Sequence, residues 1–518
     1  MKHYNLTVDK EESMIKRVNV VDVGSVKKIS DTYQRGDVCK DQVDNINFRD
    51  HEPIGAGYIA AWLKRCGFEA EIISPRSDVI SLEEALSGNP QVVCFSSLTF
   101  NYLKTRELAR KVKLAQPKII TIIGGYHAAS VPQEVSREVI AGKPLFDFVV
   151  AGEGELSIDG IMQYLNGQLS QKDIGGVVYR DGKLWANKLY RFDPHLNPVP
   201  LRPKEKMLQS RRYGLYYPAP SQQSGVTLFV WSRGCPYNCR FCSSKRMFPC
   251  CPKQPPVLYR QIGDILQEIR FCQKKYKTNF GFSVDLNAPG TVRDRDHGKD
   301  WLRELCQAVS KTGLKWYAMC RLDVDPKCFE IMKAGGCTQI GFGVESLINP
   351  LKSQTNLSIG AWRQKARDVA DQLRELKIMS KFYYIFGGIF NNQPETAEDI
   401  KAEGEQILAI NCDTIRISWM TYPLYSPEFA QLKSLGQLEA GGQNYSLMST
   451  EFPVIKVLGF TPEQLQILRT QIMADFFSPK RYGPHAKAQI ARVPEWQQSF
   501  LEFDEILRRQ FGQGWSGK

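Results

Sequence analysis

The sequence contains no long hydrophobic run. Its longest apolar stretches are only a few residues, as around Ile119 to Ile123, whereas a helix that crosses a bilayer needs roughly 20. The first residues, MKHYNLTVDKEES, also lack the apolar core and the cleavage site of a secretory signal. These absences argue against an integral membrane protein, and we expect a cytoplasmic location.

Low-complexity segments and short-period repeats are absent as well. Hydrophobic residues make up 42% of the chain, aromatic residues 11% and charged residues 24%, which excludes the disordered, collagen-like and coiled-coil classes. At roughly 150 residues per domain, a chain of 518 residues is expected to form two to four domains. Fourteen cysteines in a chain without a visible secretory signal favour buried thiols and a metal site over a disulfide framework.

Acidic residues are scarce in one part of the chain. Lys and Arg number 68 against 55 Asp and Glu, which gives a net charge of +13. Between Leu201 and Arg260, eleven basic residues accompany a single acid, Glu205. Such a run is often only a solvated face. The alternative is a docking surface for an anionic partner, and the sequence leaves both interpretations open.

Short apolar runs alternate with helical patterns in the first part of the chain. One helix is predicted to begin near Pro53 and to end at Gly67, and another to cover Asn101 to Leu114. The predicted strands are Val18–Val23, Ala70–Ile73, Val92–Phe95, Ile119–Ile123 and Phe146–Val150. This alternation is typical of a doubly wound, Rossmann-like α/β domain, whose strands are buried on both faces.

The loops that follow the last three of these strands are rich in small and hydroxyl-bearing residues. They are Ser96–Thr99, Gly124–His127 and Ala151–Glu155. In doubly wound sheets, ligands bind outside the carboxyl ends of the strands. Small residues there let the backbone approach a bulky ligand, although ordinary turn chemistry is the better explanation for any single glycine pair.

A second alternation begins at Val226, after a predicted hairpin at Gly175 to Lys183 and a Pro-, Arg- and Tyr-rich segment of linker composition. The predicted strands are Thr227–Trp231, Phe280–Val284, Lys315–Met319, Gln339–Val344, Lys381–Phe386 and Thr414–Trp419. The helices between them are predicted at residues 259–276, 299–311, 328–334, 361–376 and 397–409. Six such units predict a (β/α)6 partial barrel, with its chemistry at the carboxyl ends of the strands.

These patterns predict four parts of an α/β protein. They are a Rossmann-like domain at residues 1–165, a linker at 166–224, a partial TIM barrel at 225–435 and a small helical carboxyl-terminal domain at 436–518. The tail after Thr450 is predicted to be helical and amphipathic.

Three cysteines crowd into the loop after the first barrel strand. Cys235, Cys239 and Cys242 have the spacing C-x3-C-x2-C. Thiolates are soft ligands suited to iron–sulfur clusters, which normally take four protein ligands. With only three, one iron is left to coordinate a small molecule, like the open position of a catalytic metal. Zinc and three unconnected buried cysteines are the alternatives, but zinc sites usually present paired C-x2-C knuckles.

This loop, with the aromatic Phe241 before its last cysteine and a partial barrel after it, resembles the radical S-adenosylmethionine (SAM) superfamily. The resemblance implies a [4Fe–4S] cluster on Cys235, Cys239 and Cys242, whose unique iron chelates the amino and carboxylate groups of SAM. It also implies that reduction of the cluster cleaves SAM to a 5′-deoxyadenosyl radical, which abstracts hydrogen from unactivated carbon.

Further segments at the ends of the barrel strands resemble the same superfamily. Asp285 and Asn287 stand where the family holds the methionine amino group, in place of its usual acidic pair. Gly341–Ser346 resembles a Gly-x-Glu-Ser segment near the cofactor ribose, and Gly387–Thr396 resembles a Gly-x-Pro-x-Glu-Thr segment with extra residues. The SAM-binding residues that the resemblance implies are Phe241, Asp285, Asn287, Arg321, Glu345 and Ser346.

The first domain resembles the cobalamin-binding domain that precedes the barrel in one large radical SAM subclass. The implied cobalamin-binding residues are Ile54, Gly55, Ser97, Leu98, Thr99, Gly124, Gly125, His127, Gly152, Glu153, Gly154 and Glu155. An Asp-x-His-x-x-Gly motif is absent because Asp50 and His51 are adjacent, so the resemblance implies cobalamin without a histidine lower ligand. We expect His127 to be a hydrogen-bonding loop residue rather than a cobalt ligand.

The resemblance implies a methyltransferase that acts on an unactivated carbon of a natural-product, lipid or peptide substrate, through the 5′-deoxyadenosyl radical and methylcobalamin. Relatives with the same layout instead carry out oxidative cyclisation or ring rearrangement, so this alternative stays open. A third hypothesis, from the basic segment, is a nucleic-acid-binding iron–sulfur protein. It is weakened because the tail lacks the β-barrel pattern of the tRNA methylthiotransferases.

For the basic segment we expect docking of an acidic electron donor, such as a flavodoxin or a ferredoxin, near Arg211, Arg212, Lys245 and Arg246. The neighbouring pair Cys250 and Cys251 lies between two prolines, and we expect it to form a buried turn rather than to bind iron.

Overall fold

A computed structural model describes residues 14–23, 52–74, 80–185, 198–203, 225–248, 256–288, 297–349, 352, 355–390, 393–442, 444–448 and 452–516. The chain divides into two compact units, one built mainly from Pro53–Pro203 and the other mainly from Pro256–Lys518. Arg211, Arg212, Cys250 and Cys251 lie outside the described residues. Among those that are described, no helix combines the length and the apolar character needed to span a membrane.

The first unit contains a seven-stranded sheet in the order β2-β1-β3-β4-β7-β8-β9. Its strands are β1 (Arg17–Asp22), β2 (Glu69–Ile73), β3 (Val92–Ser96), β4 (Ile120–Gly124), β7 (Phe148–Val150), β8 (Val178–Arg180) and β9 (Lys183–Leu184). The first five in this order are parallel. Taken in chain order they follow the 2-1-3-4-5 sequence of flavodoxin-like sheets, which confirms the predicted doubly wound fold.

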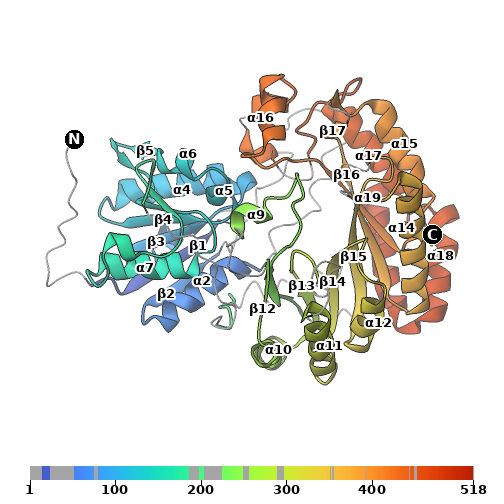
Figure 1. Cartoon of the computed structure of the whole chain (residues 1–518), viewed down its shortest axis with the longest axis horizontal. Helices are drawn as coiled ribbons and strands as arrows, with labels where there is room; N and C mark the ends of the chain where they lie inside the picture. The colour runs from blue at the N-terminus through green and yellow to red at the C-terminus, as the bar shows by residue number, and fades with distance from the viewer. Residues whose placement is uncertain are drawn as a thin grey trace. The chain divides into compact units, whose positions relative to one another are not determined.

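Helices cover both faces of this sheet (Figure 1), which is why its central strands are largely buried and mostly apolar. The first four residues of β3 are all buried. The helices are α2 (Ile54–Arg65), α3 (Leu82–Ala85), α4 (Tyr102–Ala115), α5 (Tyr126–Ser130), α6 (Pro132–Ser136) and α7 (Glu155–Leu165), and a small separate ladder joins β5 (Val139–Ile140) to β6 (Lys143–Pro144).

The first unit extends beyond the predicted boundary at residue 165. The hairpin β8–β9 is confirmed, but β8 pairs antiparallel with β7 and so covers an edge that would otherwise expose unpaired backbone groups. Further along, the backbone N–H of Leu201 donates to the carbonyl of Gly57 at 3.1 Å. The described residues between 166 and 203 therefore belong to the first unit. The described part of the predicted linker, 166–224, that precedes residue 204 is not a linker.

The second unit contains six parallel strands in the order β10-β13-β14-β15-β16-β19, which confirms the predicted partial barrel. The strands are β10 (Gly225–Phe229), β13 (Thr278–Ser283), β14 (Lys315–Arg321), β15 (Cys337–Glu345), β16 (Met379–Phe386) and β19 (Thr414–Trp419). Helices line the outside of the sheet (Figure 1). They are α10 (Ile262–Tyr276), α11 (His297–Ser310), α12 (Lys327–Ala334), α14 (Ile359–Glu375) and α15 (Ala397–Leu408).

Shorter elements lie in the loops of this unit. They are β11 (Ser232–Gly234) paired with β12 (Val257–Tyr259), β17 (Ile389–Phe390) paired with β18 (Gln393–Pro394), and α16 (Pro427–Ser434). The short helix α9 (Ser244–Met247) begins in this unit, but its residues from Lys245 on belong to the first unit.

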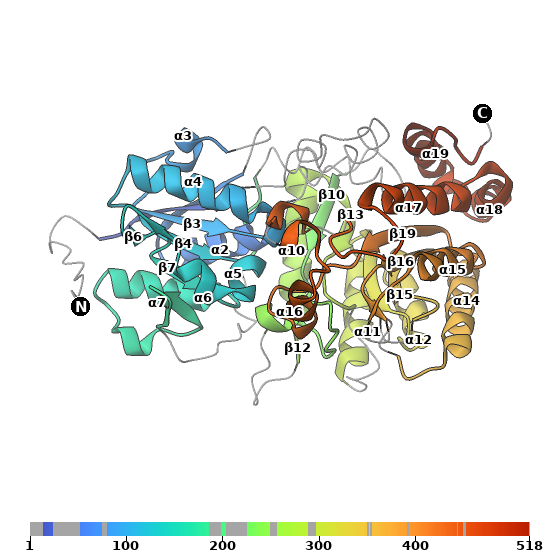
Figure 2. The same ribbon diagram turned by 90° about the horizontal axis from the view of Figure 1, so that it is seen from above.

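The tail is helical, as predicted, but it is not a separate domain. Its helices α17 (Pro462–Phe476), α18 (Pro479–Arg492) and α19 (Gln497–Phe511) lie beside the outer helices of the barrel (Figure 2). Phe476, Tyr482 and Phe500 are fully buried in the same hydrophobic core as the barrel residue Trp362. The amphipathic helices therefore complete the barrel's core instead of enclosing one of their own.

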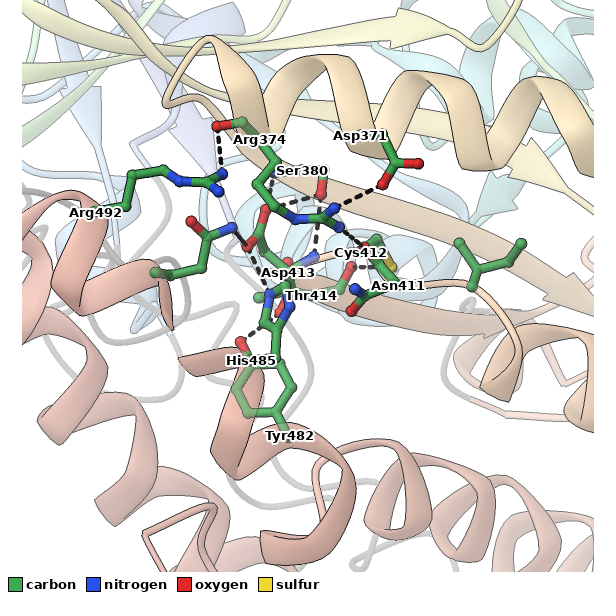
Figure 3. A network of polar contacts seen from close by, with 12 residues as sticks. Asp371, Arg374, Ser380, Asn411, Cys412, Asp413, Thr414, Tyr482, His485 and Arg492 are labelled. Carbon is green, nitrogen blue, oxygen red and sulfur yellow. Dashed lines mark hydrogen bonds and ion pairs between the residues drawn. The ribbon is translucent and has the colours of Figure 1, made fainter. Parts of the chain in front are cut away.

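A buried carboxylate fastens α18 to the barrel (Figure 3). Asp413, just before β19, accepts hydrogen bonds from the backbone N–H and hydroxyl of Ser380 at 2.7 and 2.8 Å. It also contacts His485 Nε2 at 2.8 Å and accepts from Gln489 Nε2 at 2.6 Å. Burial opposes ionisation of Asp413, but these bonds outweigh it, and its pKa lies below the usual value.

Candidate cluster and cofactor site

The three-cysteine loop begins where β11 ends. Gly234 has φ +95°, a left-handed conformation that suits glycine, and Cys235 follows it directly. The N–H of Cys242 donates to the carbonyl of Cys239 at 3.0 Å, which closes a turn within the loop. Tyr425 Oη donates to the carbonyl of Cys242 at 3.4 Å. All three cysteines are free thiols of intermediate exposure.

Arg321, at the end of β14, lies against this loop. Its Nη1 is 3.8 Å from Cys239 Sγ, and its guanidinium stacks on the ring of Tyr237 at 4.2 Å. Asp323 holds the guanidinium with two hydrogen bonds of 2.9 and 3.1 Å. Arg321 thus holds a positive charge next to a cysteine sulfur, and its predicted contact with SAM stays a prediction.

The chemistry of the donor set fits an iron–sulfur cluster. Burial raises the pKa of the Cys239 thiol to about 11, and Arg321 is the neighbour that lowers it. Iron binds the thiolate, so a cation beside the sulfur favours the form that a cluster needs. No group of three or more His, Cys, Asp or Glu side chains is already arranged for a metal ion in the described part of the chain. Cys235, Cys239 and Cys242 would hold the cluster.

Replacing Arg321 with Gln is expected to lower the midpoint potential of the reconstituted cluster by on the order of 50 mV. The reason is that a positive charge near a ligand sulfur stabilises the reduced, more negative cluster. For a one-electron couple, about 59 mV corresponds to a tenfold change in the equilibrium constant of reduction. A redox titration followed by electron paramagnetic resonance measures this shift. Arg240→Gln is the matched control, because its 70% exposed side chain pairs with Glu428 at 3.4 Å. An equal shift in both variants would contradict a specific effect of Arg321.

Asp285 supports the start of the cluster loop. It accepts hydrogen bonds from the N–H of Trp231 at 3.1 Å and the hydroxyl of Ser232 at 2.7 Å. The N–H of Ser232 and the hydroxyl of Ser283 also donate to it. Its side chain is buried, with 3% of its surface exposed. The resemblance assigned Asp285 to the methionine amino group, whereas here both of its oxygens are engaged within the chain.

Two other predicted SAM contacts have polar groups to offer. The Oδ1 of Asn287 accepts from the backbone N–H of Arg321 at 3.0 Å, while its Nδ2 is buried without a hydrogen-bond acceptor among the described residues. Glu345 ends β15 at a bulge with φ +65°, a conformation that costs about 1–3 kcal/mol outside glycine. Burial raises the pKa of its carboxyl to about 7. The buried Nδ2 donor of Asn287 suits the carboxylate of an amino acid, and the carboxyl acceptor of Glu345 suits its ammonium group.

Gly343 leaves the space that the Glu345 carboxylate occupies, because a side chain at residue 343 would collide with Glu345 Oε1. Ser346, which follows Glu345, is fully buried, and its hydroxyl is hydrogen-bonded within the chain. Its hydroxyl donates to Glu403, and it accepts from the N–H of Asn349 at 2.9 Å. Ser346 therefore anchors the loop after β15, and its predicted contact with SAM stays a prediction.

A buried ion pair lies next to this anchor and was not predicted. Lys352 Nζ is 2.5 Å from Glu395 Oε1, with side chains 4% and 3% exposed. Lys352 also donates to the carbonyl of Ile385 at 2.8 Å, so it ties the loop after β15 to β16. Glu403, which accepts from Ser346, could have been identified from the sequence, because it is an acidic residue on the otherwise apolar, core-facing side of α15.

Phe241, the remaining predicted SAM residue, packs partly buried against the apolar cluster of Met420, Tyr422 and Phe429. This contact joins the cluster loop to the segment after β19, to which Tyr425 also belongs.

In the first unit, the predicted cobalamin residues gather at the carboxyl edge of the sheet. Ser96 pairs with Gly124 in the register of β3 and β4, and the N–H of Ser97 donates to the carbonyl of Gly124 at 3.0 Å. Gly125 has φ +94°, and a side chain there would come within 2.6 Å of the Ser97 carbonyl. Leu98 is 40% exposed. Closely packed backbone and the partly exposed Leu98 therefore form this edge, where the resemblance places the cobalamin.

The other members of the set are divided between the same edge and the helix starts. Thr99 begins a short 3-10 turn, and Ile54 and Gly55 form the first turn of α2. A side chain at Gly55 would meet nothing within 4 Å, and Gly152, with φ +135°, is nearly as open. Gly154 packs on Ile59. The carboxyl-bearing residues Glu153 and Glu155 are 5% and 3% exposed.

His127 lies in α5, and its role in relation to cobalamin stays a prediction. Its backbone N–H donates to the carbonyl of Ser97 at 3.2 Å, and its fully buried ring stacks on Tyr102 with centroids 3.8 Å apart. Burial lowers the pKa of the ring to about 3, so the imidazole is neutral. To ligate cobalt, the ring would have to leave this stack.

Comparisons with known proteins agree with the two units. Residues 48–161 match the B12 binding domain family and residues 229–402 match the radical SAM superfamily. An uncharacterised methyltransferase of Pyrococcus horikoshii is 23% identical over 83% of this chain and 88% of its own length. An anaerobic magnesium-protoporphyrin IX monomethyl ester cyclase of Rubrivivax gelatinosus is 23% identical over 67% of this chain and 60% of its own length.

The fold resembles a solved structure, the radical SAM methyltransferase TsrM from Kitasatospora setae with cobalamin and a [4Fe–4S] cluster bound. The TM-score is 0.59 at 15% identity, and the match covers 90% of this chain and 82% of the other. At that identity the likeness shows the shared fold: a B12-binding domain, a radical SAM partial barrel and a helical carboxyl-terminal region.

Proposed function

We propose that this chain, which belongs to the radical SAM enzymes that carry a B12-binding domain, methylates an unactivated carbon of a small-molecule or peptide substrate. The observation that carries the proposal is the presence of both cofactor domains in one chain, together with a methyltransferase relative that aligns over 83% of it. A carbon without a lone pair cannot attack the sulfonium of SAM directly, so its methylation calls for a radical and a separate methyl donor, which the two domains would supply.

The bound cofactors would supply a 5′-deoxyadenosyl radical and a transferable methyl group. The protein's part is to hold them. Cys235, Cys239 and Cys242 are the proposed cluster ligands, and Asp285 holds their loop. We assign the contacts with the amino-acid end of SAM to Glu345, as the acceptor for its ammonium group, and to Asn287, as a donor. The carboxyl edge of β3, β4 and β7 is the proposed cobalamin surface.

Product stoichiometry tests the proposal. Reconstituted protein with cobalamin, SAM carrying a labelled methyl group, a reductant and a metabolite extract is expected to yield a labelled product. S-adenosylhomocysteine and 5′-deoxyadenosine should then form in roughly equal amounts, because one SAM donates the methyl group and another the radical. Turnover that yields 5′-deoxyadenosine alone, with no labelled product, would contradict methylation.

That outcome would instead support a second candidate, a radical cyclase. The specific observation in its favour is the Rubrivivax gelatinosus relative, which is a cyclase and aligns over 67% of this chain.

We also propose that an acidic electron donor docks on the basic segment. Of the four residues predicted to take part, Lys245 and Arg246 lie on α9 and are within the described part of the chain. Turnover driven by flavodoxin should slow steeply as ionic strength rises, because exposed charges are screened. Turnover driven by dithionite, which needs no docking surface, should change little, and the same salt dependence with both reductants would contradict the proposal.

A further inference from the structure

A pocket of about 290 Å³ lies in the second unit, where α14 and α15 lead into β16 and β19. This is the amino-terminal edge of the barrel strands, whereas the cluster loop follows the carboxyl end of β10. The residues that line the pocket are Arg374, Asn411, Arg481, Pro484, His485, Ala488, Gln489 and Arg492. None of these carries a carboxylate, and three are arginines.

Interactions within the chain fix the three guanidinium groups. Arg374 Nη2 donates to the carbonyl of Asn411 at 2.5 Å, and Arg492 Nη1 donates to the carbonyl of Arg374 at 2.7 Å. Arg481 donates to the carbonyl of Ile410 at 2.7 Å and lies over the ring of Phe476 at 3.8 Å. Because most of these partners are neutral carbonyls and a ring, the positive charge is held in place without being cancelled.

Two carboxylates lie near the pocket, against three arginines in its lining. Asp371 pairs with Arg374 at 2.6 Å, but its side chain is 63% exposed, so water screens the pair. Asp413 is bonded to the lining residues His485 and Gln489, and its other oxygen accepts from Ser380. The lining therefore gathers positive charge, and Arg492, which donates one hydrogen bond from Nη1 among the described residues, keeps most of its N–H donors for a ligand.

We propose that this pocket binds the phosphate or carboxylate group of a small anion. Arginine's planar fork matches both groups with paired, charge-assisted hydrogen bonds. The side chains of His485 and Gln489 are held in place by their hydrogen bonds to Asp413, so this side of the pocket is rigid. The volume lies at the small end of ligand pockets, which suits a compact anion rather than a large cofactor. Neither cofactor domain's proposed contacts include these residues.

Isothermal titration calorimetry of the reconstituted protein tests the proposal, with orthophosphate, pyrophosphate and citrate as separate probes at constant ionic strength. At least one probe is expected to bind saturably. A preference for the first two indicates a phosphate ligand, and a preference for citrate indicates a carboxylate. Arg492→Gln should weaken that binding about tenfold, since Arg492 makes a single bond to the chain and its loss should leave the fold intact.

Lys487→Gln is the matched control, because it removes one exposed charge from the same helix but not from the pocket lining. Its affinity should stay within about twofold of the parent. Arg492→Lys should bind with intermediate affinity, because it keeps the charge but not the fork. The proposal is wrong if no probe binds saturably, or if Arg492→Gln and Lys487→Gln lose affinity equally.

Discussion

Replacing Cys235, Cys239 or Cys242 with alanine is expected to reduce bound iron from about four atoms per chain, the content of one [4Fe–4S] cluster, to near zero after anaerobic reconstitution. Three protein sulfurs hold the cluster, so removing any one leaves two, and the cluster is lost rather than weakened. The visible absorption of the cluster and the formation of 5′-deoxyadenosine should disappear together. Iron analysis and anaerobic spectra measure both.

Cys66→Ala provides the matched control. Cys66 is exposed and directly follows α2 in the first unit, far along the chain from the cluster loop. Its variant should keep the full iron content. Cobalamin binding should survive in all four variants, because the proposed corrin edge belongs to the first unit. If the Cys239→Ala variant still held about four irons, the cluster assignment and the SAM chemistry built on it would both fail.

The sequence predicted the strands of both sheets well, because β-branched and aromatic runs between turn residues leave few alternatives. It predicted their ends less well, since ends depend on partners far away in the chain. The first barrel strand was expected to run through Trp231, but β10 ends at Phe229. The N–H of Trp231 turns instead to Asp285, 54 residues later.

The same limit applies to the candidate site. Family resemblance placed Asp285 and Ser346 near SAM from their positions after strands. In the structure each is engaged by the chain itself, Ser346 by Glu403, 57 residues away. An aligned motif identifies the residue type at a position, but not which hydrogen-bond acceptors are already filled. Likewise, the apolar faces of α17 to α19 predicted helices without predicting that their core was the barrel's.

Asp285→Asn should therefore act on the cluster and not on SAM directly. An amide offers one acceptor where the carboxylate offers two, so donors from Trp231, Ser232 and Ser283 would compete for it. Leaving one or more of them unpaired in a buried site costs about 1–3 kcal/mol each. We expect a several-fold loss of reconstituted iron, although Asp285 touches no cluster ligand in this structure.

Asn287→Asp distinguishes this support from a contact with SAM. It keeps an oxygen for the backbone N–H of Arg321 and removes the buried Nδ2 donor. Iron content should stay near the parent value, while the dissociation constant of SAM should rise about tenfold, or roughly 1.4 kcal/mol. If Asp285→Asn instead kept its iron and only weakened SAM, Asp285 would hold the amino group as the family pattern implies. The hydrogen bonds from the cluster loop to Asp285 would then have to break when SAM binds, because the same carboxylate lone pairs cannot accept from the loop and from SAM at once.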